Sequence, residues 1–242
     1  MKWEGICFDL DNTLFSHEKA FKHAIKASFE HYLSNVVKMK EDPISFNDFF
    51  NVFKSNSDRY WSMYESKELT GRDYRRLRFM KTMEAFKLPS SHEHADLFHE
   101  YYYNIVDDFS EPYPGMEQLL SFLKNRNIQL GIITNGMVDT QYGKVKKIGA
   151  GKWIPENNII VSEEVGVVKP STEIFRIAEK RMKLRPDQLL FIGDSWKHDV
   201  EGAKQAGWEA IFLNSRNEER NSAVEPFIEC QSLIDVYNEL LV

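Results

Sequence analysis

Short, unbroken runs of apolar residues alternate with helical patterns, and this alternation restricts the fold more than any other feature of the sequence. The runs are continuous rather than alternately apolar and polar, as expected of parallel strands covered on both faces. The intervening helical patterns predict βαβ units and an α/β fold with a parallel sheet. The predicted strands are Gly5–Phe8, Gln129–Thr134, Asn158–Val161, Leu189–Gly193 and Ala210–Leu213, and the helices between them are Gly115–Asn125, Ser171–Arg181 and Asp199–Ala206.

A long helical stretch interrupts this pattern directly after the first predicted strand. No convincing strand lies between Leu14 and Tyr113, where apolar residues recur at helical spacing. Two helix starts are indicated by N-cap spacings, Thr70 with Asp73 and Ser90 with Glu93. We therefore predict a sheet-containing core formed by residues 1–15 and 113–242, with a helical domain, residues 16–112, inserted into it.

Composition and charge exclude several classes of protein. Among 242 residues, 31 Lys and Arg oppose 37 Asp and Glu, a net charge of −6 that argues against binding a nucleic-acid polymer. No apolar run is long enough to cross a membrane, and acidic residues near the N-terminus argue against a signal peptide. Cys7 lies in an apolar run, and two cysteines make no disulfide framework. We expect a cytoplasmic protein without membrane attachment.

Two carboxylates follow the first predicted strand. Asp9 and Asp11 are two residues apart, so their side chains face the same side of extended backbone. The carboxyl edge of an open α/β sheet is where ligands bind. Two adjacent carboxylates repel each other unless a cation or a shared proton offsets them. Taken alone, the pattern is equally typical of a surface turn.

Further polar groups follow the later strands and favour a site over a turn. Thr134 and Asn135 end the second strand, Asp194 ends the fourth, and Asp199 follows five residues later. Lys169 supplies a cation before a predicted helix. Carboxylates suit Mg²⁺, which prefers oxygen ligands, and a lysine with a hydroxyl can orient phosphate oxygens. The combination indicates phosphoryl transfer.

Four segments resemble the ordered motifs of the haloacid dehalogenase superfamily. They are Phe8-Asp9-Leu10-Asp11-Asn12-Thr13-Leu14, Thr134-Asn135-Gly136, Lys169-Pro170 and Gly193-Asp194-Ser195 with Asp199. The resemblance covers the whole chain and implies a Rossmann-like core with the Asp9 strand at its centre. It also implies that the helical insertion is a cap of the family's first type.

The resemblance assigns roles to five residues that would act on the substrate. Asp9 resembles the nucleophile that becomes an aspartyl-phosphate, and Asp11 the general acid and base. Thr134 and Asn135 resemble donors to the phosphate oxygens, and Lys169 the cation that bridges nucleophile and phosphate.

The resemblance also implies a magnesium site. Asp9, the backbone carbonyl of Asp11, and Asp194 resemble its direct ligands. Asp199 resembles a carboxylate that orients metal-bound water or binds directly.

The expected function is Mg²⁺-dependent hydrolysis of a small phosphorylated metabolite. The segments Ile132–Gly136 and Val161–Pro170 are similar to those of bacterial pyrimidine 5′-nucleotidases, and N-acylneuraminate-9-phosphatases share much of the same pattern, so nucleoside monophosphates are candidate substrates. Asp11 favours a phosphatase over a 2-haloacid dehalogenase, because a departing halide needs no proton. A phosphomutase and a catalytically silent binding module remain alternatives.

The predicted insertion carries aromatic and basic residues whose role can be interpreted in two ways. They form either a surface that stacks on a base and steers phosphate, or a packed aromatic core beside a solvated basic face. The residues are Tyr60, Trp61, Tyr64, Arg72, Arg75, Arg76 and Arg78.

Overall fold

The computed structural model describes residues 2–39 and 44–241. Contacts between Cα atoms divide the chain into two compact units. The core unit comprises Met1–His17 and Ser110–Val242, and the helical unit comprises Glu18–Phe109. Each unit is described by itself.

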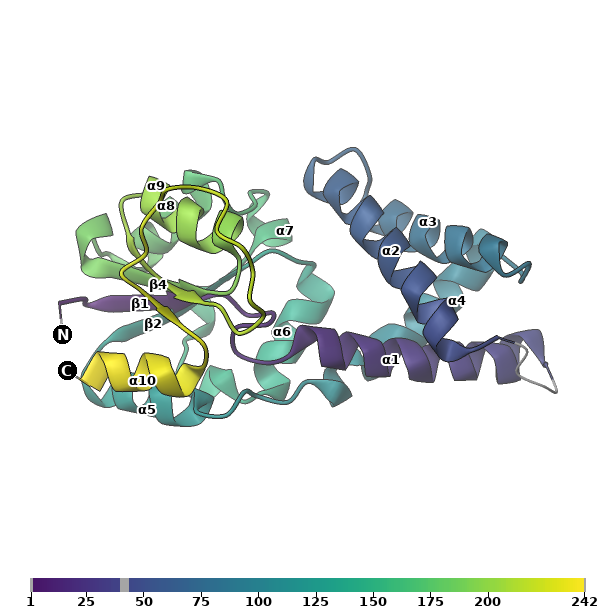
Figure 1. Ribbon diagram of the computed structural model, residues 1–242, viewed down its shortest axis with the longest axis horizontal. Helices are drawn as coiled ribbons and strands as arrows, with labels where there is room; N and C mark the ends of the chain where they lie inside the picture. The colour runs from purple at the N-terminus through teal and green to yellow at the C-terminus, as the bar shows by residue number, and fades with distance from the viewer. Residues whose placement is uncertain (1, 40–43, 242) are drawn as a thin grey trace. The chain divides into compact units, whose positions relative to one another are not determined.

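A six-stranded, fully parallel sheet forms the centre of the core unit (Figure 1), in the order β3-β2-β1-β4-β5-β6. β1 lies inside the sheet between β2 and β4, as the family resemblance implied. All five predicted strands are present, while β6 was missed because it is only three residues long and includes Glu229. The strands are β1 (Gly5–Phe8), β2 (Gln129–Thr134), β3 (Ile159–Val161), β4 (Leu189–Gly193), β5 (Glu209–Leu213) and β6 (Ile228–Cys230).

Helices cover both faces of the sheet, which explains why its strands are apolar throughout. Figure 1 shows α5 (Met116–Asn125) and α10 (Leu233–Leu241) on one face, and α8 (Thr172–Met182) and α9 (Gly202–Gln205) on the other. Cys7 is 1% exposed in the core beneath α8, as predicted. The structure is therefore the predicted α/β sandwich.

Two helical segments of the core unit differ from the sequence prediction. The segment Asp199–Ala206 was predicted as one helix, but a π-helical turn, Trp196–Glu201, precedes the short α9. The helix α6 (Val138–Lys147) was not predicted, because Gln141 and Lys144 occupy buried positions that an amphipathic pattern gives to apolar residues. The short helix α7 (Ser162–Val165) follows β3 directly.

The helical unit is built around phenylalanine side chains. Its helices are α1 (His17–His31, starting one residue before the unit), α2 (Phe46–Glu65), α3 (Gly71–Ala85) and α4 (His92–Ile105), with a π-helical segment, Tyr32–Val37, after α1. Phe49 and Phe53 of α2 are fully buried, and Phe29 of α1 stacks on Phe49 with ring centroids 4.0 Å apart. Each such side chain contributes roughly 1.5–3 kcal/mol by leaving water, which holds the helices together.

One of the two predicted helix starts in this unit is confirmed and the other is wrong by one residue. The Thr70 hydroxyl accepts a hydrogen bond from the Asp73 amide at 3.1 Å, as expected of an N-cap. At α4, however, Ser91 rather than Ser90 caps the helix and accepts from His94. Adjacent serines offer the same hydroxyl, so the sequence alone could not choose between them.

Arg78 and His99 are buried together inside the helical unit. Arg78 is 5% exposed, and its guanidinium lies over the rings of Tyr74 and Phe53, so it does not belong to a solvated basic face. His99 Nε2 contacts the carbonyl of Arg75 at 2.8 Å, and Nδ1 lies 3.4 Å from Arg78 Nη2. Burial, and then the positive charge of Arg78, lower the pKa of His99 well below its ordinary value.

The neutral state of His99 predicts a loss of stability in mild acid. Below about pH 6.5 the unfolded chain takes up a proton at His99 that the folded chain does not, so stability falls as the pH falls. The expected loss approaches about 1.4 kcal/mol per pH unit below that point. His99→Gln should flatten this dependence in chemical unfolding between pH 7 and 5. Substitution of exposed His92 on the same helix should leave it unchanged, and equal slopes for all three proteins would contradict the assignment.

Candidate active site

The register of the sheet brings three motif segments to one level at its carboxyl edge. Phe8 of β1 is in register with Ile132 of β2 and with Ile192 of β4. Asp9 follows Phe8 by one residue, and Thr134 and Asp194 follow their partners by two. The parallel arrangement therefore places all three at the same edge, as the sequence predicted.

A buried lysine joins two of the predicted carboxylates. Lys169 Nζ donates to Asp9 Oδ1 at 2.7 Å and to Asp199 Oδ1 at 2.6 Å, and its side chain is 2% exposed. Burial opposes the charge on Lys169, but the two carboxylates outweigh burial and raise its pKa. The pKa of Asp9 rises to about 6 because burial outweighs the pull of Lys169. Asp9 is thus held in place by a cation, although burial makes its ionisation harder.

Asp194 completes the acidic cluster, and its carboxyl is harder to ionise than that of Asp9. Burial, followed by repulsion from Asp9 and Asp199, raises its pKa to about 8. The Thr13 hydroxyl lies within hydrogen-bonding distance of Asp9 Oδ2, at 3.1 Å, and Asp194 Oδ1, at 3.3 Å. Arg216 also donates to Asp194. The positive charge beside Asp194 in the core unit is therefore too small to keep its carboxyl fully ionised. A further cation would be needed.

The fourth motif depends on a close approach that only glycine allows. Asp199 Oδ2 accepts a hydrogen bond from the Ser195 amide at 2.9 Å, which turns this carboxylate back toward the strand end. A side chain at Gly193 would collide with the Asp199 carboxylate. The absence of a Cβ at Gly193 therefore lets Asp199 reach Lys169.

The acidic cluster fits a hard divalent cation. Asp9, Asp194 and Asp199 each offer a carboxylate oxygen, and these oxygens lie within 4.8 Å of one another. Oxygen donors and excess negative charge are what Mg²⁺ requires. The Asp11 carboxylate is not in this cluster; its expected metal contact is through its backbone carbonyl and stays a prediction.

Thr134 and Asn135 lie at the same edge with different partners. The Thr134 hydroxyl oxygen accepts from Gln141 Nε2 at 3.1 Å. The Asn135 side chain binds the backbone of Lys169, since Oδ1 accepts from its amide at 2.8 Å and Nδ2 donates to its carbonyl at 3.0 Å. These contacts hold the third motif against the second, whereas direct contact of Asn135 with substrate stays a prediction.

Asp11 has an environment opposite to that of Asp194. Burial alone would raise its pKa, but Lys144, then His17, outweigh burial and lower it to about 2. Lys144 Nζ lies 2.9 and 3.0 Å from the two carboxylate oxygens, Gln141 donates to Oδ2 at 3.1 Å, and His17 Nδ1 lies 3.6 Å from Oδ1. Asp11 is thus ionised in this arrangement.

Several residues that contact the site carry little signal in the sequence. Thr13 lies within the first motif but is an ordinary turn residue there. Gln141 and Lys144 are three residues apart on α6, a spacing that fits any solvated helix. Arg216 lies in an irregular segment with no pattern. His17 lies six residues after Asp11, outside the first motif.

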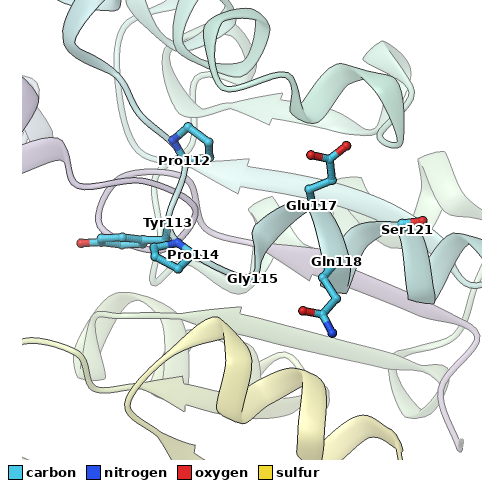
Figure 2. Close-up of a pocket in the computed structure, with 7 residues that line it drawn as sticks. All are labelled: Pro112, Tyr113, Pro114, Gly115, Glu117, Gln118 and Ser121. Carbon is cyan, nitrogen blue, oxygen red and sulfur yellow. The ribbon is translucent and has the colours of Figure 1, made fainter.

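The hollow that Figure 2 shows on the core unit lies apart from these residues. It is formed by the proline-rich connector and the first turns of α5, and it is lined by Pro112, Tyr113, Pro114, Gly115, Glu117, Gln118 and Ser121. Glu117 is its only charged side chain. This hollow has no cation for a phosphate and contains none of the four motifs.

The geometry agrees with a known family of hydrolases. Residues 3–207 match the haloacid dehalogenase-like hydrolase family. The chain belongs to this family. It is a hydrolase, as the four motifs implied. No helix in the described part of the chain combines the length and apolar character needed to span a membrane.

Individual relatives extend over nearly the whole chain. The sequence is 28% identical to pyrimidine 5′-nucleotidase YjjG of Escherichia coli, covering 96% of each chain. It is 26% identical to a glyceraldehyde 3-phosphate phosphatase of Methanopyrus kandleri, covering 98% of each. The fold matches the HAD-hydrolase YfnB of Bacillus subtilis, a structure bound to magnesium, with a TM-score of 0.83, 23% identity and full coverage of both chains. It also matches L-2-haloacid dehalogenase of Xanthobacter autotrophicus, with a TM-score of 0.72, 17% identity and coverage of 99% and 98%.

The repulsion within the acidic cluster predicts opposite effects of Asp194→Asn with and without metal. Without metal the substitution relieves the burial and repulsion that oppose ionisation of Asp194, so the unfolding temperature should stay level or rise. Saturating Mg²⁺ should stabilise the unsubstituted protein, by about 2.7 kcal/mol at one hundred times the dissociation constant, and the variant much less. Thermal unfolding with and without Mg²⁺ measures both effects. Asp187→Asn, at an exposed site, is the control, and an unchanged Mg²⁺ response in Asp194→Asn would exclude Asp194 as a ligand.

Proposed function

We propose that the protein is a Mg²⁺-dependent phosphatase of small phosphomonoesters, with nucleoside 5′-monophosphates among the candidate substrates. The observation that carries the proposal is the contact of Lys169 with both Asp9 and Asp199 beside Asp194. A buried nucleophile next to a cation and an oxygen-rich metal cluster suits a phosphate group. The names of the two relatives, a nucleotidase and a sugar-phosphate phosphatase, support the same substrate class.

In the first half of the proposed reaction, Asp9 attacks the phosphorus. Its carboxylate oxygen forms a bond to phosphorus, and the bond from phosphorus to the leaving oxygen breaks. Asp11 supplies the proton that this oxygen needs. The lysine and Thr134 face the developing charge on the phosphoryl oxygens. The product of this half is an acyl phosphate on Asp9 and a free alcohol.

In the second half, water hydrolyses the acyl phosphate. Asp11 takes a proton from the water, whose oxygen bonds to phosphorus while the bond to Asp9 breaks. Inorganic phosphate leaves and Asp9 is restored. The ionised state of Asp11 suits this role as base. In the first half it must bind a proton, which the approach of a negatively charged phosphate favours.

Asp9, Asp194 and Asp199 would hold the metal, with the backbone carbonyl of Asp11 as a proposed further ligand. When bound, Mg²⁺ would neutralise the cluster and polarise the phosphoryl oxygens. When all three buried carboxylates are ionised, Lys169 and Arg216 together still leave an excess of negative charge. That excess would repel a phosphate dianion.

The roles of Asp9 and Asp11 can be separated by comparing two phosphate esters that differ in their leaving group. Asp9→Asn should abolish turnover of every phosphate ester. Asp11→Asn should slow hydrolysis of an alkyl phosphate by about 10²–10⁴-fold, because the leaving oxygen needs a proton. With p-nitrophenyl phosphate, whose leaving anion is stable, Asp11→Asn should give a burst of about one equivalent of nitrophenol followed by slow turnover. Mass spectrometry should find phosphate on the peptide that contains Asp9.

Three outcomes would contradict the proposed function. Phosphate attached to histidine or serine would exclude the aspartyl-phosphate route. Full activity after removal of metal by EDTA would exclude the role of Mg²⁺. Halide release from a 2-haloacid without phosphate release from any ester would make the protein a dehalogenase.

We further propose that the helical unit selects the substrate. Trp61 packs on Tyr64 and Tyr74, and the Arg75 guanidinium lies over Tyr103, 4.6 Å from the ring centroid. Trp61→Leu and Arg75→Met should change relative kcat/KM among several nucleotides and sugar phosphates by about tenfold, while hydrolysis of p-nitrophenyl phosphate changes little. A uniform loss on all substrates, or no loss, would assign these residues to packing alone.

A further inference from the structure

Two buried donors on α6 meet the carboxylate of Asp11 from a distant part of the chain. Gln141 and Lys144 are 1% and 4% exposed, and both contact Asp11 across more than a hundred residues of sequence. Lys144 spans both carboxylate oxygens, while Gln141 contacts one of them. The orientation of this carboxylate is therefore set by α6.

The Gln141 amide also ties Asp11 to the second motif. Its nitrogen lies 3.1 Å from Asp11 Oδ2, 3.1 Å from the Thr134 hydroxyl and 3.2 Å from the carbonyl of Asn135. A side chain at Gly136 would collide with this amide, so the glycine of the motif makes the contact possible. One amide group thus holds Asp11 beside Thr134, the proposed donor to the substrate phosphate.

A gain in stability does not explain why the charged pair of Lys144 and Asp11 occupies this position. Among the described residues, Asp11 is the carboxylate that Lys144 pairs with, and the ammonium also lies 5.8 Å from the centre of the Phe15 ring. Taking the Lys144 ammonium and the partly exposed Asp11 carboxylate out of water costs desolvation free energy that their attraction only roughly offsets, so such a pair adds little net stability over apolar side chains. The pair does fix the position of both oxygens of Asp11.

We infer that Gln141 and Lys144 are positioning residues for the general acid and base. They act through Asp11: Lys144 sets the direction of its carboxylate, and Gln141 sets its distance from Thr134. This inference rests on the proposed function, since it gives α6 a role only if Asp11 transfers protons. Neither residue lies within the four motif segments.

The test compares an alkyl with an activated aryl phosphate in the same preparation. Lys144→Met and Gln141→Leu should lower kcat on the alkyl phosphate on the order of tenfold or more, as part of the roughly 10²–10⁴-fold effect of general acid–base catalysis. The release of nitrophenol from p-nitrophenyl phosphate in the first turnover should change much less. The ratio of the two rates does not depend on the fraction of protein that is folded. Lys144→Arg should restore much of the ratio, and Lys146→Met, at an exposed site on the same helix, should leave it unchanged.

A double-mutant cycle decides whether the effect passes through Asp11. If it does, adding Lys144→Met to Asp11→Asn should cause no further loss on the alkyl phosphate. A further tenfold loss in the double variant, or equal losses for both leaving groups, would overturn the inference while leaving the proposed function intact. No phosphate release by the unsubstituted protein from either ester, with no label on Asp9, would overturn the proposed function and this inference together.

Discussion

The contact of the Lys169 ammonium with Asp9 and Asp199 is the interaction on which the rest of the site depends. All three side chains are buried, so each charge has lost most of its hydration and needs a partner. Without the lysine, neighbouring carboxylates would face each other in a medium that screens their repulsion poorly. The backbone of Lys169 is held in turn by the Asn135 side chain, so the second and third motifs are coupled through two hydrogen bonds.

Three aspartates at one edge of the sheet differ widely in the pKa of their side chains. Burial raises the pKa of Asp9 to about 6 and, with two carboxylate neighbours, that of Asp194 to about 8. Burial also acts on Asp11, yet Lys144 and His17 bring its pKa down to about 2. The difference comes from the local balance of cations and anions rather than from the residue itself. In the proposed mechanism, such separation would let one aspartate hold a metal or attack while another exchanges protons.

At two glycines of the motifs, the backbone packs closely against polar side chains of the candidate site. Gly193 makes room for the Asp199 carboxylate, and Gly136 makes room for the Gln141 amide. Gly193 is the last residue of β4 and Gly136 follows β2 by two residues, and after each glycine the chain turns within a few residues into a helical segment. The glycines therefore allow polar groups on the following helical turns to fold back over the strand ends, where the parallel sheet gathers the reactive groups.

The sequence by itself determined five of the six strands, the helical stretch after the first strand and the four motifs, because each leaves a local pattern of apolar spacing or clustered polar residues. It also predicted that Asp9 and Asp194 gather, since parallel strands share their carboxyl edge, and the family resemblance implied that Asp199 joins them. It did not identify Gln141 and Lys144 as partners of Asp11, nor Arg216 as a partner of Asp194. Those pairings join residues far apart in the chain, and their side chains look like ordinary solvated ones. Only tertiary structure decides them, because the burial and neighbours that fix a carboxylate's charge arise from packing and not from local sequence.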